Sequence, residues 1–315
     1  MGFTYAKLPG GVRPRFIDPS ALERSTRRYK SAQTSLIRHF CSTCGCHIGG
    51  INESTGIWQV SPGIFAQREG NFVIIEHIFT KSAPAGLHEW LPKIGPRSVR
   101  VWNPDGNIAE PRMPQPEKDE NGKDWLRAEC ACGGVSFTIP RPTPEVFQDE
   151  YTRGLVSPVD PTKWKAMTDA CNDCRQNTGF QLNAWVYVPL KLIKPRIGLD
   201  LTHGFMQTYS SSPGNIRSFC GVCGATVLFW GEERHTTDDN YVVNISTGIL
   251  RAPDGVRADS WLTWRTEELG WFDAGCKYDR ELYVSLNEGH RDWGRRVYGS
   301  LTDFKLPSPH YSSAQ

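Results

Sequence analysis

Three pairs of closely spaced cysteines constrain this chain more than any other feature of its sequence. The pairs have the spacings C-x-C, C-x-x-C and C-x-x-C-G, and they follow one another between residues 130 and 223. Short spacings of this kind let one turn direct two thiolates at a single metal ion, and zinc prefers four ligands in a tetrahedron. The sequence therefore predicts a metal-stabilised fold around Cys130 and Cys132, Cys171 and Cys174, and Cys220 and Cys223.

Six cysteines exceed the four that one tetrahedral zinc ion needs. A closed four-thiolate site, together with an open site that leaves a position for water or substrate, would use all three pairs. A redox C-x-x-C pair is the alternative, although such pairs usually occur in a βαβ context. Cys276 has no cysteine nearby in the sequence, and a lone cysteine is typically a small buried apolar side chain.

The composition is that of a globular protein with little affinity for polyanions. Hydrophobic residues make up 38% of the 315 residues, and the formal net charge is only +2. Nucleic-acid binding needs concentrated Lys and Arg, so we do not expect it. No apolar signal segment or membrane-spanning run is visible, so we expect a cytoplasmic or nuclear protein without a membrane partner. In those compartments the ten cysteines stay reduced, which favours metal binding over disulfides.

Short runs of β-branched and aromatic residues predict a mainly β, antiparallel fold. Helical signals are few, with Asp18 as a candidate N-cap for one of them. The turn residues that bound the runs are typical of strand ends. We predict strands at 71–79, 134–139, 183–190, 225–230, 240–246 and 281–286, and helices at 18–31 and 261–269.

The chain contains a partial internal repeat. Residues 36–48, LIRHFCSTCGCHI, resemble residues 215–227, NIRSFCGVCGATV, and the cysteines of the two segments align at a constant offset of 179 residues. Residues 102–125 are rich in proline and charge, and they indicate a linker. We therefore divide the chain into an N-terminal unit (1–101), the linker (102–125), a C-terminal unit (126–300) and a tail (301–315).

The N-terminal unit lacks a C-x-C pair before its C-x-x-C. Cys41 and Cys44 are therefore candidate metal ligands with no obvious partners, although Cys46, His39 and His47 lie close in sequence. A degenerate repeat without metal is the alternative. An incomplete sheet would leave edges exposed, so we expect the N-terminal unit to pack on the C-terminal unit or on another chain.

The motifs CACGGV, CNDCRQNTG and RSFCGVCGATV, in this order, resemble those of the CENP-V/GFA family, named after the glutathione-dependent formaldehyde-activating enzyme. The resemblance covers about residues 125–295 and, in part, 25–100. It implies an antiparallel β-tent that carries zinc. It also implies that the structural zinc ligands are Cys130, Cys132, Cys220 and Cys223.

The middle motif departs from the family pattern. The resemblance implies three thiolates on a catalytic zinc at a C-x-C-x-x-C segment, but this chain reads DACNDC, with Asp169 in place of the first cysteine. Carboxylate oxygen is a zinc ligand too, so Asp169, Cys171 and Cys174 could still form an open site that is harder and less thiophilic. The alternative is that Asp169 only caps a turn and that the site binds metal weakly or not at all.

The resemblance implies a carbon–sulfur lyase of the S-(hydroxymethyl)glutathione synthase type, with a thiol such as glutathione and an aldehyde as its small-molecule partners. An open zinc site suits this reaction, because the ion activates a thiol and polarises a carbonyl oxygen. Arg175 is a candidate for binding a substrate carboxylate through its guanidinium, or for a structural ion pair. A zinc-stabilised binding module without catalysis is the alternative function.

Overall fold

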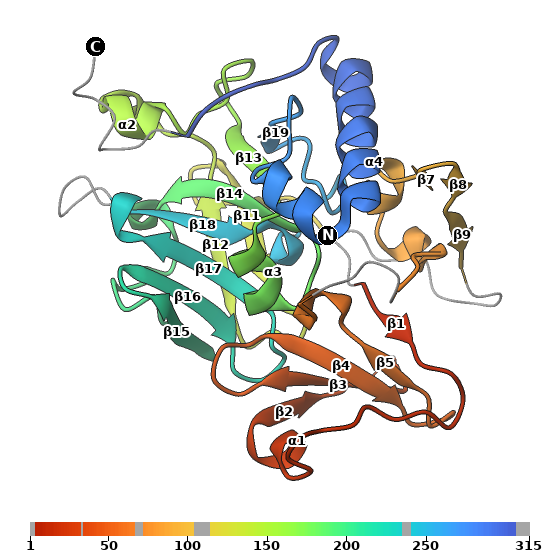
Figure 1. The fold of residues 1–315 in the computed structure, drawn as a ribbon. Helices are drawn as coiled ribbons and strands as arrows, with labels where there is room; N and C mark the ends of the chain where they lie inside the picture. Colours follow the sequence, from red (N-terminus) through yellow and green to blue (C-terminus); the bar gives the residue numbers. More distant parts are fainter. Residues whose placement is uncertain (1–3, 33, 67–71, 104–113, 235–240, 307–315) are drawn as a thin grey trace.

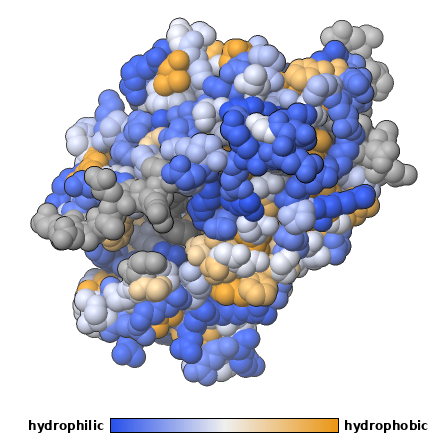
Figure 2. Space-filling model, turned by 180° about the vertical axis from the view of Figure 1, so that it is seen from behind, coloured by the Kyte–Doolittle hydropathy of each residue, from blue (hydrophilic) through white to orange (hydrophobic). Residues whose placement is uncertain are grey.

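The computed structural model describes residues 4–32, 34–66, 72–103, 114–234 and 241–306 (Figure 1). It is mainly β, with 32% strand and 23% helix, and its sheets are largely antiparallel. Among the described helices, none has the length and apolar character needed to cross a bilayer. The face drawn in Figure 2 is largely hydrophilic, with a few separate hydrophobic areas.

The N-terminal unit folds around a five-stranded antiparallel sheet, which lies below the larger sheet in Figure 1. Its strand order is β1 (Ala6–Lys7), β5 (Trp58–Val60), β4 (His47–Asn52), β3 (Leu36–Cys41) and β2 (Thr26–Tyr29). After the sheet come the 3-10 turn η1 (Pro62–Ile64) and two small strand pairs, β6 (Glu76–Ile78) with β9 (Arg100–Trp102) and β7 (Lys93–Ile94) with β8 (Arg97–Ser98).

The C-terminal unit contains a seven-stranded sheet, a three-stranded sheet and three described α-helices. The larger sheet has the order β15 (Met206–Ser212), β16 (Asn215–Cys220), β17 (Thr226–Gly231), β18 (Val242–Ser246), β14 (Asn183–Pro189), β13 (Trp164–Asp169) and β19 (Leu262–Trp264). The smaller sheet is β10 (Glu117–Lys118), β11 (Asp124–Glu129) and β12 (Ser136–Pro140). The helices are α2 (Glu150–Arg153), α3 (Asn172–Thr178) and α4 (Phe272–Tyr298).

One hydrophobic core joins the two sheets of the C-terminal unit. Phe137 and Ile139 of β12 alternate with half-buried residues, as in a strand with one buried face. They belong to the same buried cluster as Val186 and Val188 of β14. The predicted strands at 134–139, 183–190, 225–230 and 240–246 correspond to β12, β14, β17 and β18, although residue 240 lies outside the described part of the chain.

Two predictions near the C-terminus were wrong. Residues 281–286, predicted as a strand, lie within α4, where Leu282 and Leu286 stand one helical turn apart and are both buried. The aromatic and β-branched residues of this segment favoured a strand prediction, although its buried residues follow the 3.6-residue period of a helix. Residues 261–269, predicted as a helix, include β19, which pairs in parallel with β13. The pairing to a distant strand outweighs the local helical signal.

The N-terminal predictions were also too long. The helix expected over 18–31 shrinks to α1 (Ala21–Arg24), because Thr26–Tyr29 pairs with β3 as strand β2. In the run 71–79 only Glu76–Ile78 is strand, and residue 71 lies outside the described residues.

Parts of the predicted linker and tail pair with or pack on the C-terminal unit. Residues 104–113 of the predicted linker lie outside the described residues, but β10 and the start of β11 fall within 114–125, because this segment pairs with β12 and its neighbours. The tail begins packed: Thr302 donates its backbone N–H to Thr266 Oγ1 at 2.9 Å, and Phe304 is buried. Residues 307–315 lie outside the described residues.

The two C-x-x-C-G segments pack against each other. A Cβ added at Gly45 would lie 2.4 Å from Cγ of Phe219, and one added at Gly224 would lie 2.6 Å from Cγ of Phe40. Each phenylalanine directly precedes the first cysteine of its own segment. Both glycines have φ above +70°, a conformation that glycine adopts without strain. The units therefore meet through equivalent turns, in a reciprocal contact.

We expect Gly45→Ala to lower the free energy of unfolding by about 3 kcal/mol, since left-handed strain and overpacking against buried Phe219 both act. Gly56→Ala is the matched control, because Gly56 also has positive φ but nothing within 4 Å of its added Cβ. It should cost only about 1 kcal/mol. Urea unfolding of the two variants measures the difference, and equal losses would contradict the reciprocal packing.

Candidate metal centres

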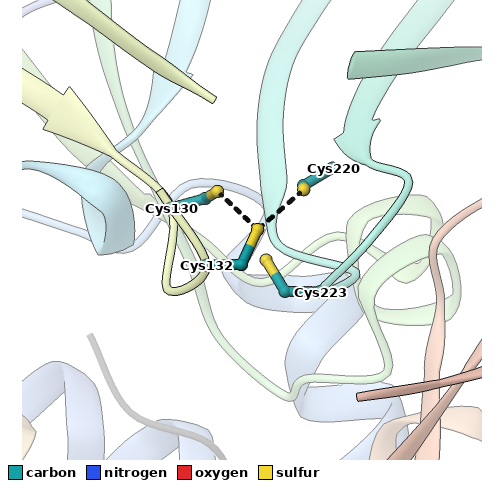
Figure 3. A group of neighbouring side chains, drawn as sticks. All are labelled: Cys130, Cys132, Cys220 and Cys223. Atoms are coloured by element: carbon teal, nitrogen blue, oxygen red, sulfur yellow. Dashed lines mark hydrogen bonds between the residues drawn. The ribbon is translucent and has the colours of Figure 1, made fainter. Parts of the chain in front are cut away.

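Four thiols converge where the smaller sheet meets the larger one (Figure 3). Cys130 and Cys132 lie in the turn between β11 and β12, and Cys220 and Cys223 lie at the turn between β16 and β17. The Sγ atoms of Cys130 and Cys132 are 3.5 Å apart, and so are those of Cys132 and Cys220. All four sulfur atoms lie within 4.8 Å of one another, and none is in a disulfide.

This geometry fits a tetrahedral metal ion. Zinc–sulfur bonds of about 2.3 Å place the sulfur atoms of a tetrahedral site roughly 3.8 Å apart. Backbone hydrogen bonds fix both turns, because Gly224 N donates to the Cys220 carbonyl at 2.9 Å and Gly133 N donates to the Cys130 carbonyl at 3.0 Å. The four residues therefore could hold a closed metal site.

Hydrogen bonds among the thiols and burial shift the pKa values of Cys130, Cys132 and Cys223. Hydrogen bonds from Cys220 and Cys223 lower the pKa of Cys130, whereas donating to Cys130 raises the pKa of Cys223. Burial raises the pKa of Cys132 to about 11. Thiols bind zinc as thiolates, so metal binding at this group should release protons.

The second group consists of Asp169, Cys171 and Cys174, whose ligand atoms also lie within 4.8 Å of one another. Asp169 ends β13, and Cys171 is the N-cap of α3. The Cys171 thiol accepts the Cys174 backbone N–H at 3.2 Å, which turns both sulfur atoms toward the same point. Two thiols and one carboxylate match a three-ligand site with one open position.

The two carboxylate oxygen atoms of Asp169 accept different hydrogen bonds. Oδ1 accepts the backbone N–H of Cys171 at 2.8 Å, and Oδ2 accepts the Cys174 thiol hydrogen at 3.3 Å. The first contact is the turn-capping role considered above, and the second leaves Oδ2 among the candidate ligand atoms. A hydrogen bond to Cys171, together with burial, raises the pKa of Cys174, so metal would have to displace its proton too.

A buried arginine beside this group was missed by the sequence reasoning. Nη1 of Arg217, on β16, lies 3.7 Å from the Cys174 sulfur, and the side chain is 7% exposed. The guanidinium stacks over Phe229 at 4.6 Å. Among the described residues, no carboxylate lies within ion-pair distance of it. The sequence signals this arginine only by its position three residues before Cys220 of the C-x-x-C segment. The pairing of β16 with β17 fixes the strand that carries Arg217 beside Cys174.

Arg175 joins the two units. Its Nη1 donates to the carbonyls of Gly63 and Phe65 in the N-terminal unit, and the guanidinium stacks 3.8 Å from the ring of Tyr278. The side chain is only 3% exposed. The sequence suggested that this guanidinium binds a substrate carboxylate, but here it already binds two backbone carbonyls and an aromatic ring. We therefore assign Arg175 a structural role.

Cys41 and Cys44 stand apart from both candidate metal groups. Among the described residues, no group of three metal-ligating side chains includes Cys41 or Cys44. His39 stacks on Trp58, with ring centroids 5.7 Å apart, and His47 Nε2 bonds the Gly224 carbonyl at 2.9 Å. Neither histidine belongs to a metal-ligating group among the described residues. A hydrogen bond from Cys44 lowers the pKa of Cys41 to about 5.

No model of a known protein family matches the chain, and no curated protein matches it either.

We expect two metal equivalents per chain, and one in the Cys171→Ser, Cys174→Ser double variant, because the double variant removes two of the three ligands of one group. Inductively coupled plasma mass spectrometry measures the stoichiometry. A single equivalent in both proteins would show that the Asp169 group does not bind metal durably.

We also expect Cys41 to be alkylated by iodoacetamide at nearly the same rate at pH 6 and pH 8, because a pKa of about 5 keeps it a thiolate throughout. Burial raises the pKa of Cys276, so its rate should rise roughly tenfold per pH unit. Peptide mass spectrometry compares the two residues. Equal pH profiles would contradict the Cys44–Cys41 hydrogen bond.

Proposed function

We propose that the protein is a zinc-dependent enzyme that joins a thiol to an aldehyde, in the manner of the CENP-V/GFA family. Glutathione and formaldehyde are the proposed substrates, and S-(hydroxymethyl)glutathione is the product. The observation that carries the proposal is the convergence of Asp169, Cys171 and Cys174, which matches a three-ligand open site. The closed four-cysteine group is the proposed structural zinc site.

The reaction forms a carbon–sulfur bond between the thiol sulfur and the carbonyl carbon, and the thiol proton ends on the carbonyl oxygen. A zinc ion in the Asp169 group would supply a Lewis acid and lower the pKa of the thiol. Cys171 is the half-buried member of the group, so substrate would approach from its side. Arg217 offsets the negative charge of the ligands, since its guanidinium lies next to Cys174.

The proposed fold is a β-tent with a partial second copy in the N-terminal unit. Hydrogen bonds at aligned positions support this. Cys41 N donates to Cys46 O and Cys220 N donates to Ala225 O, both at 2.8 Å. Each unit also shifts register at the residue before its aligned phenylalanine, between His39 and Phe40 and between Ser218 and Phe219.

A zinc-stabilised binding module is the second candidate. It is favoured by the capping bond from Cys171 N to Asp169 Oδ1, which gives Asp169 a role without metal. The two candidates differ in the use of the Asp169 group. Zinc in this group with no thiol-dependent turnover would favour the binding module.

We expect Cys171→Ser to lower kcat/KM for glutathione and formaldehyde at least about 100-fold, because it removes a ligand of the open site. Cys276→Ser is the matched control, since Cys276 lies near the start of α4 and belongs to neither candidate group. Nuclear magnetic resonance follows product formation against the uncatalysed reaction. Wild-type turnover in Cys171→Ser would contradict the proposed enzyme.

A further inference from the structure

Strand β2 of the N-terminal unit faces both turns that supply the four thiols. Arg27 and Tyr29 are two residues apart and therefore point to the same side of the strand. Arg27 Nη1 donates to the carbonyl of Gly221 at 2.7 Å, and Gly221 lies between Cys220 and Cys223. Tyr29 Oη donates to the carbonyl of Ala131 at 3.3 Å, and Ala131 separates Cys130 from Cys132.

A third contact comes from strand β4. His47 Nε2 lies 2.9 Å from the carbonyl of Gly224, the residue after Cys223, and the histidine is 2% exposed. Burial lowers the pKa of His47 to about 4, so the ring is neutral at physiological pH. The carbonyl can only accept, so Nε2 carries the hydrogen in this contact. Phe40 packs on the same glycine.

These contacts hold together turns that are far apart in the sequence, since Cys132 and Cys220 are separated by 88 residues. Hydrogen bonds that orient a metal-binding segment keep its ligand atoms in place when the ion exchanges. The positive charge of Arg27 would also stabilise a metal-loaded four-cysteine site. Four thiolates around a divalent ion carry a net charge of about −2, and the Arg27 cation at Gly221 partly offsets it.

We propose that the N-terminal unit is a clamp on the four-cysteine site, in which Arg27, Tyr29 and His47 position the two ligand turns and slow the loss of metal. The three side chains are positioning residues, because they contact backbone carbonyls of the turns. The proposal needs metal only in the four-cysteine group and does not depend on the proposed enzyme activity.

The test measures zinc release from the full chain into excess chelator, followed with a colorimetric zinc indicator. All variants carry Cys171→Ser and Cys174→Ser, so that only zinc in the four-cysteine group is counted. The clamp variants are Arg27→Met, Tyr29→Phe and their combination. Arg28→Met is the matched control, because this substitution removes the same charge from an exposed position of the same strand. Since Arg27 and Tyr29 face the site, Arg28 between them points to the opposite side of the strand.

We expect the combined variant to release zinc at least about tenfold faster than the parent, and Arg28→Met to stay within about twofold of it. Tyr29→Phe keeps the ring and removes only the hydroxyl, so it should accelerate release with an unchanged far-ultraviolet circular dichroism spectrum. Equal rates in parent and clamp variants would overturn the proposal. So would equal acceleration by Arg28→Met, or the absence of zinc from the parent.

Discussion

The convergence of four thiols at one point is the constraint on which the rest of this structure depends. Cys130 and Cys132 come from the hairpin of the small sheet, and Cys220 and Cys223 come from a hairpin of the large sheet. The sulfur atoms of Cys132 and Cys220 lie 3.5 Å apart although they come from turns of two separate sheets. A metal ion bound by these four sulfur atoms would cross-link the two sheets and stabilise the fold.

The N-terminal unit contacts the two cysteine turns of the C-terminal unit. Its strand β2 reaches Gly221 and Ala131, and its η1 turn accepts hydrogen bonds from Arg175 on α3, the helix that carries Cys174. One unit thus contacts the segments that form both candidate metal groups. Hydrogen bonds and close packing at glycines hold the two units together at this interface.

Local patterns predicted the parts of the fold in which neighbours in sequence decide the conformation. The strands β12, β14, β17 and β18 were found because alternating and apolar runs between turn residues have few alternatives. Helix α4 was missed because Tyr283 and Val284 carry a β propensity that burial against a tertiary partner outweighs. The segment around Leu262 failed for the opposite reason, since only its pairing with β13 makes it a strand.

The sequence by itself determined the cysteine groups, because spacings of one or two residues confine the thiols to single turns whatever the fold. It also determined the mainly β class, since that follows from short-range alternation. Only the tertiary structure decided which side chains surround these groups. It placed Arg217 beside Cys174, turned His47 toward Gly224 and engaged Arg175 with Gly63. Each of these contacts joins residues more than 40 positions apart, and such contacts depend on strand pairing and unit packing, which no local pattern encodes.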